Sequence, residues 1–409
     1  MNGIPPIERK PDLVLLIGCS RGWGLTYYNT VLAIAMKRAG LPLVVLSTTR
    51  EQSPGFHAKL WAAEITVVDD PSLDVADVWS MWRSAKVIAR LCVPGLNIVH
   101  AEGIRHTIAG WLAKRLLPKN KRLAVTTVLG AMRNASRIWP FYYAAGSAIL
   151  NVAADKVLLL CEEEKRKMVS CGLRTSKAGV GYFPVDNETS FQTKPDLTKL
   201  VPCVDDPRIY DRSRRKVIYL AQFFRHKGHE NLIRAWEGVC RHFPDLLLVL
   251  AGSGPMFQEC GALVARLGLN ENVCLLPRIP REAVPALLSL CSYGVVTSRT
   301  ETFGSCIVEP LLAGLSVCTT PVGIARELAA IGGVHLLKTV APGPLAEQMC
   351  GFFSDKELAL AQMECGRSWV VDHCAESKFV ARLTNGWAEL AQNSLETSMA
   401  EWNCDNSVH

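Results

Sequence analysis

Residues 298–314 read S-R-T-E-T-F-G-S-C-I-V-E-P-L-L-A-G, and the rest of the chain is organised around them. Two carboxylates, Glu301 and Glu309, stand eight residues apart around a Phe-Gly-Ser turn at positions 303–305. An apolar strand pattern over residues 293–297 leads into the turn, and a helical pattern follows it. The spacing therefore predicts a strand, a tight turn and a helix, with one carboxylate on the turn and one on the helix.

This arrangement suits a ligand that carries hydroxyls beside phosphate. Gly304 lets a ligand approach the backbone closely, and the first free N–H groups of the helix form an anion site that the helix dipole reinforces. Glu301 and Glu309 flank that site. A helix start with acidic residues in its first turn is also common where nothing binds, so the stretch alone leaves both interpretations open.

Length and composition indicate a two-domain globular protein. The chain has 409 residues, of which 49% are hydrophobic and 20% charged. No apolar run reaches the ~20 residues of a membrane helix, and residues 1–10 lack the apolar core of a secretory signal. The 15 cysteines form no Cys-x-x-Cys pair and no close Cys/His cluster, so we expect reduced thiols, a cytosolic compartment and no metal site. The net charge of +7 lies in basic clusters without interleaved aromatics, so we expect no nucleic-acid partner.

The first strand–loop–helix unit contains a glycine-rich loop. An apolar run over residues 13–18 is followed by Gly22, Trp23 and Gly24 and then by a helical pattern over residues 27–38. Such a loop can hold a phosphate or sugar at the helix N-terminus, or it can be an ordinary tight turn, and the residues favour neither. The glycine spacing does not match the dinucleotide fingerprint, so we expect no nicotinamide cofactor.

The same alternation of apolar runs and helical patterns continues along the chain, pauses over residues 183–215 and then restarts. It predicts two doubly wound parallel-sheet α/β domains that face a central cleft. The domains are expected at 1–205 and 206–375, with a C-terminal helix at 376–396 that packs back toward the first domain and a loose tail at 397–409. Strands are expected at 13–18, 43–47, 65–68, 98–101, 123–128, 156–160, 217–221, 246–251, 273–276, 293–297 and 316–319, and a long helical pattern spans 358–390.

Cationic residues and glycines follow two strands of the second domain. Arg225 and Lys227 come after the strand at residues 217–221, and Gly252 and Gly254 come after the next strand. Cations on a loop at the carboxyl edge of a sheet are well placed to meet phosphate, although a solvated basic turn would look the same.

In the first domain, His100 and Glu102 close the strand at residues 98–101. Ligands of open α/β sheets usually lie at such strand ends. His100 can equally be a strand-end histidine whose hydrogen bonds are satisfied within the protein.

Together these motifs resemble the retaining, nucleotide-sugar-dependent glycosyltransferases of family 4, a branch of the group 1 glycosyltransferases with the GT-B fold of two Rossmann-like domains. Residues 301–314 match the paired-glutamate motif of that family, with its seven-residue gap. Residues 221–228 look like its Lys-Gly phosphate loop, residues 251–255 resemble its Ala-Gly-x-Gly-Pro turn, and residues 322–327 resemble the turn after its next strand. The resemblance covers nearly the whole chain and is most specific over residues 217–327.

The resemblance implies a role for each site residue. Lys227, helped by Arg225, would contact the donor diphosphate, while Glu301 would bind the hydroxyls of the transferred sugar and Glu309 those of the ribose. The other donor-binding positions would be Gly22, Trp23, Gln222, Gly252, Gly254, Phe303, Gly304 and Ser305, with His100 and Glu102 on the acceptor side. The family scheme uses a UDP- or GDP-sugar as substrate and implies no metal and no further cofactor.

We therefore expect a cytoplasmic, metal-independent hexosyl- or related glycosyltransferase of polysaccharide or glycolipid biosynthesis. It would transfer sugar with retention from a nucleotide diphosphate sugar to a glycan or lipid-linked acceptor. Docking on an anionic membrane surface would suit a set of basic and aromatic residues, namely Lys119, Lys121, Arg122, Arg133, Arg137, Trp139 and Tyr142.

Two departures from the family pattern keep alternatives open. Residues 221–222 read Ala-Gln where the family usually has Gly-Arg, and residues 129–130 read Leu-Gly where His-Gly is common. They favour a catalytically impaired, glycosyltransferase-like binding subunit that supports an active partner, although the intact glutamate pair and loop lysine argue against it. A further alternative keeps the cleft but changes the reaction to nucleotide-sugar epimerisation or hydrolysis.

Overall fold

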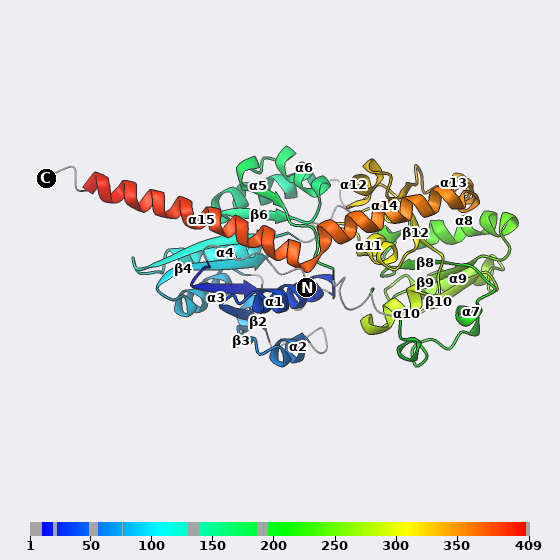
Figure 1. Cartoon of the computed structure of the whole chain (residues 1–409), viewed down its shortest axis with the longest axis horizontal. Coiled ribbons are helices and arrows are strands. Elements are labelled where there is room, and N and C mark those ends of the chain that lie inside the picture. The colour runs from blue at the N-terminus through cyan, green and yellow to red at the C-terminus, as the bar shows by residue number, and fades with distance from the viewer. Residues whose placement is uncertain are drawn as a thin grey trace. The chain divides into compact units, whose positions relative to one another are not determined.

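The computed structural model describes residues 10–18, 23–48, 56–75, 77–129, 139–185, 191 and 195–405 (Figure 1). The chain divides into two compact units. Unit 1 comprises Met1–Val185 and Cys374–His409, and unit 2 comprises Asp186–His373. Each unit contains one parallel sheet with helices packed on it, which confirms the two doubly wound α/β domains predicted from the sequence.

Unit 1 is built on a seven-stranded parallel sheet with the order β3-β2-β1-β4-β5-β6-β7. Its strands are β1 (Leu13–Ile17), β2 (Leu43–Ser47), β3 (Thr66–Asp69), β4 (Gly95–Glu102), β5 (Lys121–Val128), β6 (Lys156–Leu159) and β7 (Ala178–Val180). Its helices are α1 (Trp23–Arg38), α2 (Phe56–Ala62), α3 (Val78–Leu91), α4 (Gly103–Lys114), α5 (Trp139–Ala153), α6 (Glu162–Ser170) and α15 (Glu376–Asp405), with short 3₁₀ turns at Pro71–Asp74 and Thr175–Lys177.

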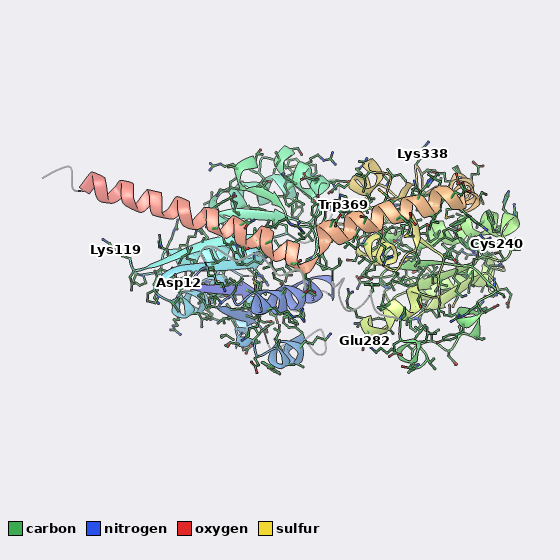
Figure 2. The ribbon with its side chains drawn as sticks, in the orientation of Figure 1. Asp12, Lys119, Cys240, Glu282, Lys338 and Trp369 are labelled. Atoms are coloured by element: carbon green, nitrogen blue, oxygen red, sulfur yellow. The ribbon has the colours of Figure 1, made fainter. Side chains whose placement is uncertain are left out.

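The central strands of unit 1 are apolar because helices cover both faces of the sheet. All five residues of β1 are buried. Asp12, just before this strand (Figure 2), accepts the backbone N–H of Leu96 at 2.7 Å and so ties β1 to β4. The C-terminal helix α15 completes the core of the unit, where Phe379 packs edge-on against Tyr28 of α1 with ring centroids 5.6 Å apart.

Unit 2 is built on a six-stranded parallel sheet with the order β10-β9-β8-β11-β12-β13. Its strands are β8 (Lys216–Leu220), β9 (Leu247–Ala251), β10 (Val273–Leu276), β11 (Tyr293–Val296), β12 (Ser316–Thr319) and β13 (His335–Leu336). Its helices are α7 (Pro207–Tyr210), α8 (His229–His242), α9 (Phe257–Arg266), α10 (Val284–Leu288), α11 (Ser305–Leu312), α12 (Ala325–Ala330), α13 (Pro342–Ser354) and α14 (Lys356–Cys374), with 3₁₀ turns at Leu197–Lys199, Arg225–Lys227 and Arg281–Ala283.

Helices α8 and α13 pack side by side on one face of this sheet (Figure 1). The fully buried Trp236 of α8 meets Phe353 of α13 edge-on, with ring centroids 6.3 Å apart. This aromatic packing holds the middle of α8 against α13.

All strands expected from the sequence occur, and the structure adds the edge strands β7 and β13. The stretch over residues 195–215, expected to be linker and flanks, instead contributes Leu200, Val204 and Ile209 to the core of unit 2. The division at Val185 places residues 191–205 in unit 2, whereas the expected first domain ran to residue 205.

The long helical pattern at the C-terminus forms two helices rather than one. They are separated at Ala375, which pairs with Val185 in an isolated parallel bridge. The second helix, α15, is the helix expected at residues 376–396, and it belongs to unit 1 as expected. It extends to Asp405 and so covers most of residues 397–409, which were expected to be loose.

Candidate active site

The candidate site lies at the carboxyl edge of the unit 2 sheet, where the strand order changes direction. The chain runs outward from β8 to β9 and β10 and then returns to place β11 on the other side of β8. Ligands of open α/β sheets bind at such a switch point. The loops that leave β8 and β11 carry Lys227 and Glu301, both of which the sequence analysis named as candidate site residues.

A glycine with positive φ joins these two loops. Gly228 has φ +76°, and a Cβ there would lie only 2.4 Å from the carbonyl oxygen of Thr297. The backbone N–H of Arg299 donates to the carbonyl of His226 at 2.8 Å, and the Thr297 hydroxyl donates to the Gly228 carbonyl at 3.3 Å. Only glycine allows this close approach, which holds Lys227 next to the loop that carries Glu301.

Gly252 and Gly254 perform a similar task on the other side of β8. A Cβ on Gly252 would lie 2.1 Å from the Ala221 carbonyl oxygen, and one on Gly254 would lie 2.6 Å from that of Phe223. The backbone N–H of Phe223 also donates to the Ser253 carbonyl at 2.9 Å. These glycines, expected to bind the donor, therefore shape the β8 loop by direct backbone contact.

Lys227 and Glu301 form a nearly buried ion pair. The Lys227 Nζ lies 2.6 Å from Glu301 Oε1, and the two side chains are 15% and 11% exposed. Burial acts to lower the pKa of Lys227, but the adjacent carboxylate outweighs it, so that the pKa lies above its ordinary value. Lys227 is therefore a fixed positive charge at neutral pH.

Two further donors reach the same carboxylate oxygen. The Ser298 hydroxyl donates to Glu301 Oε1 at 2.6 Å, and the Cys306 thiol donates to it at 3.5 Å. Cys306 belongs to the first turn of α11, so this contact brings the beginning of α11 next to the ion pair. Sequence reasoning missed Ser298 and Cys306 as partners, although both lie within the quoted motif.

The expected Phe-Gly-Ser turn forms at the start of α11. Gly304 caps the helix with φ +101°, Ser305 is its first residue, and Phe303 is buried. The Phe303 carbonyl accepts the backbone N–H of Ile324 at 2.9 Å, which fixes the turn against the loop that follows β12. The first turn of α11 thus lies next to Glu301, which the Cys306 side chain of that turn contacts.

Glu309, the second carboxylate of the motif, is buried on α11 and pairs with Arg281. The Arg281 Nη1 lies 2.9 Å from Glu309 Oε1, and the Glu309 side chain is 7% exposed whereas that of Arg281 is 41% exposed. Arg281 comes from the 3₁₀ turn after β10. No sequence motif marks Arg281, but its position after a strand at this sheet edge was a usable signal.

The remaining predicted residues of the β8 loop are on the surface. Gln222 and Arg225 are both exposed, and no hydrogen bond or ion pair of the Arg225 side chain is found among the described residues. Arg225 is therefore available to a ligand, in contrast to the paired Lys227.

In unit 1, His100 lies inside the core rather than on an open surface. Its Nε2 is 3.1 Å from the Tyr28 hydroxyl and its Nδ1 is 2.9 Å from the Thr126 hydroxyl. Burial lowers the pKa of His100 to about 3. This geometry matches the second interpretation given above, a strand-end histidine whose hydrogen bonds are satisfied within the protein.

Glu102 is the residue before α4, and its Oε2 accepts from the Asn29 amide at 2.7 Å. Trp23 is the first residue of α1, and Gly22 lies outside the described residues. Unit 1 therefore brings His100 and Glu102 to the same end of β4.

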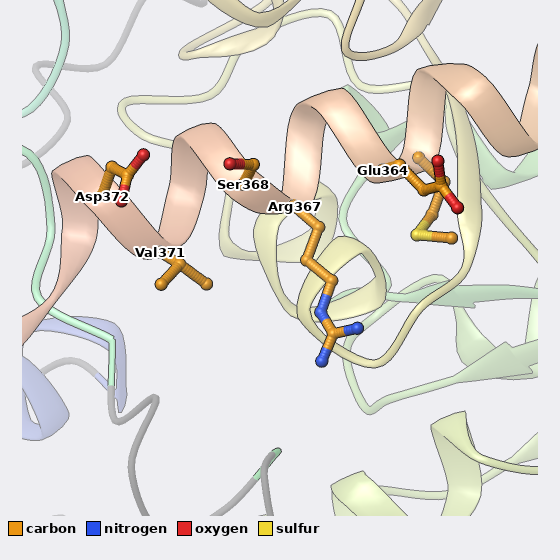
Figure 3. A pocket seen from close by; sticks show the side chains of 6 residues that line it. Glu364, Arg367, Ser368, Val371 and Asp372 are labelled. Carbon is orange, nitrogen blue, oxygen red and sulfur yellow. The ribbon is translucent and has the colours of Figure 1, made fainter.

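A shallow hollow on α14 (Figure 3) contains none of the predicted residues. It is lined by Met363, Glu364, Arg367, Ser368, Val371 and Asp372, most of them exposed. Over the described ranges, no group of three or more His, Cys, Asp or Glu side chains is arranged to hold a metal ion. Within the same ranges, no helix combines the length and apolarity needed to cross a bilayer.

The chain is similar to several glycosyltransferases, and the family match covers the residues of this site. Residues 208–369 match the family described as glycosyl transferases group 1. The phosphatidylinositol N-acetylglucosaminyltransferase GPI3 subunit of Saccharomyces cerevisiae is 30% identical over 31% of this chain and 28% of its own length. N-acetyl-alpha-D-glucosaminyl L-malate synthase of Bacillus anthracis is 24% identical over 70% of this chain and 73% of its own length. HepE of Anabaena, solved in complex with UDP and glucose, has a TM-score of 0.74 at 17% identity over 92% of this chain and 99% of HepE.

The fold is that of the GT-B proteins. The match to the group 1 glycosyltransferases covers residues 208–369 and lies within the unit that carries the Lys227–Glu301 pair. The chain spans less than half the length of several curated relatives, the yeast subunit among them.

Proposed function

We propose that the chain transfers a sugar, with retention, from a nucleoside diphosphate sugar to a hydroxyl of a glycan or lipid-linked acceptor. The observation that carries this proposal is the Lys227–Glu301 pair, held at 2.6 Å beside the first turn of α11 at the switch point of the sheet. A cation, free helix amides and a carboxylate in one place suit a ligand in which phosphate adjoins sugar hydroxyls.

Lys227 would stabilise the leaving diphosphate. Its ammonium has three N–H groups, and only the contact with Glu301 is found among the described residues, so further donors remain for phosphate oxygens. Negative charge grows on the diphosphate as the glycosidic bond breaks, and a cation fixed in a nearly buried site stabilises that charge strongly. Arg225, exposed two residues earlier, would supply a second cation and offset the Gln at position 222.

The protein's main task in this scheme is positioning. The leaving phosphate oxygen accepts the proton of the acceptor hydroxyl while the new C–O bond forms on the same face of the sugar, which gives retention without a separate protein base. Glu301 would hold the transferred sugar by its hydroxyls. Glu309, kept in place by Arg281, would receive the ribose hydroxyls.

The test is a thermal-shift screen against UDP-, GDP- and ADP-glucose, starting with UDP-glucose because HepE was solved with UDP and glucose. A ligand that binds only the folded state raises the melting temperature. At a ligand concentration of about a hundred times Kd, it increases the free energy of unfolding by about 2.7 kcal/mol. The shift should vanish in Lys227→Ala and Glu309→Ala and persist in Lys338→Ala, an exposed lysine of the same unit (Figure 2). Absence of any shift with all three donors would contradict the proposal.

A catalytically impaired binding subunit is the second candidate. Both motif carboxylates already hold an internal cation, Lys227 or Arg281, and the yeast relative is itself named as a subunit. Purified protein that binds donor but transfers no sugar to any acceptor tested, with wild type and Glu301→Ala equal, would favour this candidate. Turnover that Glu301→Ala abolishes would exclude it.

A lipid-linked acceptor would require a surface that meets the membrane, and α5 supplies one. The helix contains no charged residue, and its exposed side chains are apolar or aromatic. They are Pro140, Phe141, Tyr142, Ala144, Ala145, Ala148, Ile149 and Val152. At its C-terminal end, the backbone N–H of Arg174 donates to Asn151 Oδ1 at 2.9 Å, and Lys177 Nζ donates to the Asn151 carbonyl at 2.8 Å. Two basic residues thus adjoin the apolar face, as anionic lipid surfaces prefer.

This surface revises the basic and aromatic set expected from the sequence. Tyr142 belongs to it and Lys119 is exposed, whereas Arg133, Arg137 and the side chain of Trp139 lie outside the described residues. Flotation with vesicles of phosphatidylcholine and phosphatidylserine should capture the wild type and lose Val152→Glu. Val201→Glu is the matched control, because Val201 of unit 2 is 61% exposed and Val152 is 65% exposed. Equal flotation of both variants would contradict membrane docking through α5.

A further inference from the structure

The two oxygens of the Glu301 carboxylate have different surroundings. Oε1 receives three donors from three segments, Lys227 at 2.6 Å, Ser298 at 2.6 Å and Cys306 at 3.5 Å. Oε2 has no hydrogen-bond partner among the described residues, and it is not among their buried unpaired atoms. One oxygen is thus fully engaged by the protein while the other is open to solvent or ligand.

Counting protons extends this network to a buried tyrosine. The Tyr219 hydroxyl lies 2.7 Å from Ser298 Oγ and 3.0 Å from the carbonyl oxygen of Lys227. The single Ser298 proton must point to Glu301, because a carboxylate can only accept. Ser298 Oγ is then an acceptor for the Tyr219 proton at 2.7 Å, and the Lys227 carbonyl accepts the same proton over the longer distance of 3.0 Å. The Thr297 hydroxyl also donates to the Lys227 carbonyl, in a bond that it shares between the carbonyls of Lys227 and Gly228 at 3.2 and 3.3 Å.

We infer that Tyr219 and Ser298 are positioning residues that hold Glu301 with Oε2 directed outward as an acceptor for vicinal hydroxyls of the transferred sugar. The inference rests on the proposed function, which assigns the hydroxyls of the transferred sugar to Glu301, and it adds the two residues that position this carboxylate. Tyr219 is fully buried and β8 holds it rigidly, so the orientation of the Ser298 proton is set from within the core. Glu309, which pairs with Arg281, lies three residues beyond Cys306 on α11, so the ribose hydroxyls proposed for Glu309 meet a different carboxylate from the one that Tyr219 and Ser298 position.

The first experiment is calorimetric titration of UDP-glucose and UDP into the wild type and variants of the full chain. Ser298→Ala should weaken UDP-glucose binding roughly tenfold or more, because it removes a hydrogen bond to a charged group, and should leave UDP binding unchanged. Ser298→Thr keeps the hydroxyl and should restore most of the loss. Tyr219→Phe should cost a few-fold, because Ser298 keeps its proton but loses the partner that orients it.

Ser316→Ala is the matched control, since it removes a buried hydroxyl of the same unit that donates to Ala359 at 2.7 Å, away from Glu301. Melting temperatures identify any variant that fails to fold. Equal losses for UDP and UDP-glucose in Ser298→Ala, or no loss in either, would overturn the inference.

A ligand-free measurement separates this inference from the proposed function. Crystal structures of the wild type should have Glu301 in one rotamer with Oε1 toward Ser298, and those of Ser298→Ala should have a second Glu301 rotamer populated. An unchanged single rotamer in Ser298→Ala would overturn the network. If UDP-glucose does not bind the wild type, the proposed UDP-sugar donor fails, while the rotamer comparison still decides whether Tyr219 and Ser298 position Glu301.

Discussion

His229, the first residue of α8, is buried in an aromatic stack beside the site. Its ring lies 4.1 Å from that of Phe223 and 4.8 Å from that of Tyr219, centroid to centroid. Neither ring nitrogen has a hydrogen-bond partner within the described structure. Burial first, and then the positive charge of Lys227, lowers the pKa of His229 to about 3, so the ring is neutral at physiological pH.

We expect His229→Phe to stabilise unit 2 by about 1 kcal/mol or more, because it keeps the stack and removes two unpaired buried nitrogens. Urea unfolding measures the change. His229→Ala is the control and should destabilise by roughly 2–4 kcal/mol, because it leaves a cavity between the two rings. Destabilisation by the phenylalanine variant would mean that the imidazole has a partner, such as an ordered water.

The site residues differed in how well they could be predicted from the sequence. Glu301 and Glu309 were predicted as a pair because their spacing is local. The cation that pairs with Glu301 lies 74 residues away in the sequence, and the one that pairs with Glu309 lies 28 residues away. Lys227 carried its own Lys-Gly signal, whereas Arg281 lay in a turn without a motif. The buried network of Tyr219 and Ser298 depends on the packing of β8 against the β11 loop, which no local pattern encodes.

Helix α14 packs against the rest of unit 2 through a contact between two glycines. Gly366 faces the backbone of Gly333, after α12, and a Cβ on Gly366 would lie 2.3 Å from the Gly333 carbonyl oxygen. Both partners are backbone, so neither can move away cheaply. The close approach of α14 to its unit therefore depends on the absence of a side chain at this position.

Gly366→Ala should destabilise the protein by about 1–3 kcal/mol through overpacking, although alanine is the better helix former. Gly261→Ala in α9 is the matched control, because a Cβ there would meet nothing within 4 Å, and it should stabilise by roughly 0.5–1 kcal/mol. Differential scanning fluorimetry of both variants measures the contrast. Equal effects from the two substitutions would contradict the glycine contact.

Helices and strands were predicted more reliably than site residues or unit boundaries, because periodicity and turn residues are local. The division of the C-terminal helical pattern into two helices is an exception. The amphipathic pattern continues across Ala375, and the break between α14 and α15 is imposed by the pairing of Ala375 with Val185, nearly two hundred positions earlier. Edge strands β7 and β13, with three and two residues, were too short to give a period.

Buried neutral histidines set the acid stability of the whole molecule. Burial lowers the pKa to about 3 in His100 and His229 and to about 4 in His106. These folded-state values lie below the unfolded value of about 6.5, so the unfolded chain takes up protons first as the pH falls. The stability they allow is present above about pH 6.5 and is lost progressively as the pH approaches 4.

We expect the free energy of unfolding to fall by up to about 4 kcal/mol per pH unit near pH 5, since each such histidine contributes about 1.4 kcal/mol per unit. Urea titrations across this range measure the slope. His229→Phe should make the slope shallower by one histidine's share. A stability that stays flat from about pH 6.5 to 4 would mean that these rings are accessible to protons in the folded state.

The two-domain α/β plan was predictable for the whole molecule because it follows from the order of the elements. The division between the units was not, because residues 195–215 look like linker in sequence and acquire a core role only through contacts with the second sheet. Which unit owns a segment is a property of packing, and sequence reports packing only where the pattern is periodic.

Unit 1 is completed by a segment that the chain reaches only after it has passed through all of unit 2. Val185 donates its backbone N–H to the Cys374 carbonyl at 2.9 Å, and Phe379 and Trp387 fill the core beside Tyr28 and His100. On the ribosome, the first domain to emerge is thus left with an open apolar surface until the last helix is made, while the inserted domain can fold at once. Order of synthesis and order of folding are therefore reversed in this chain, and a stop at residue 374 would release unit 2 with its core complete and unit 1 without the helix that completes its core.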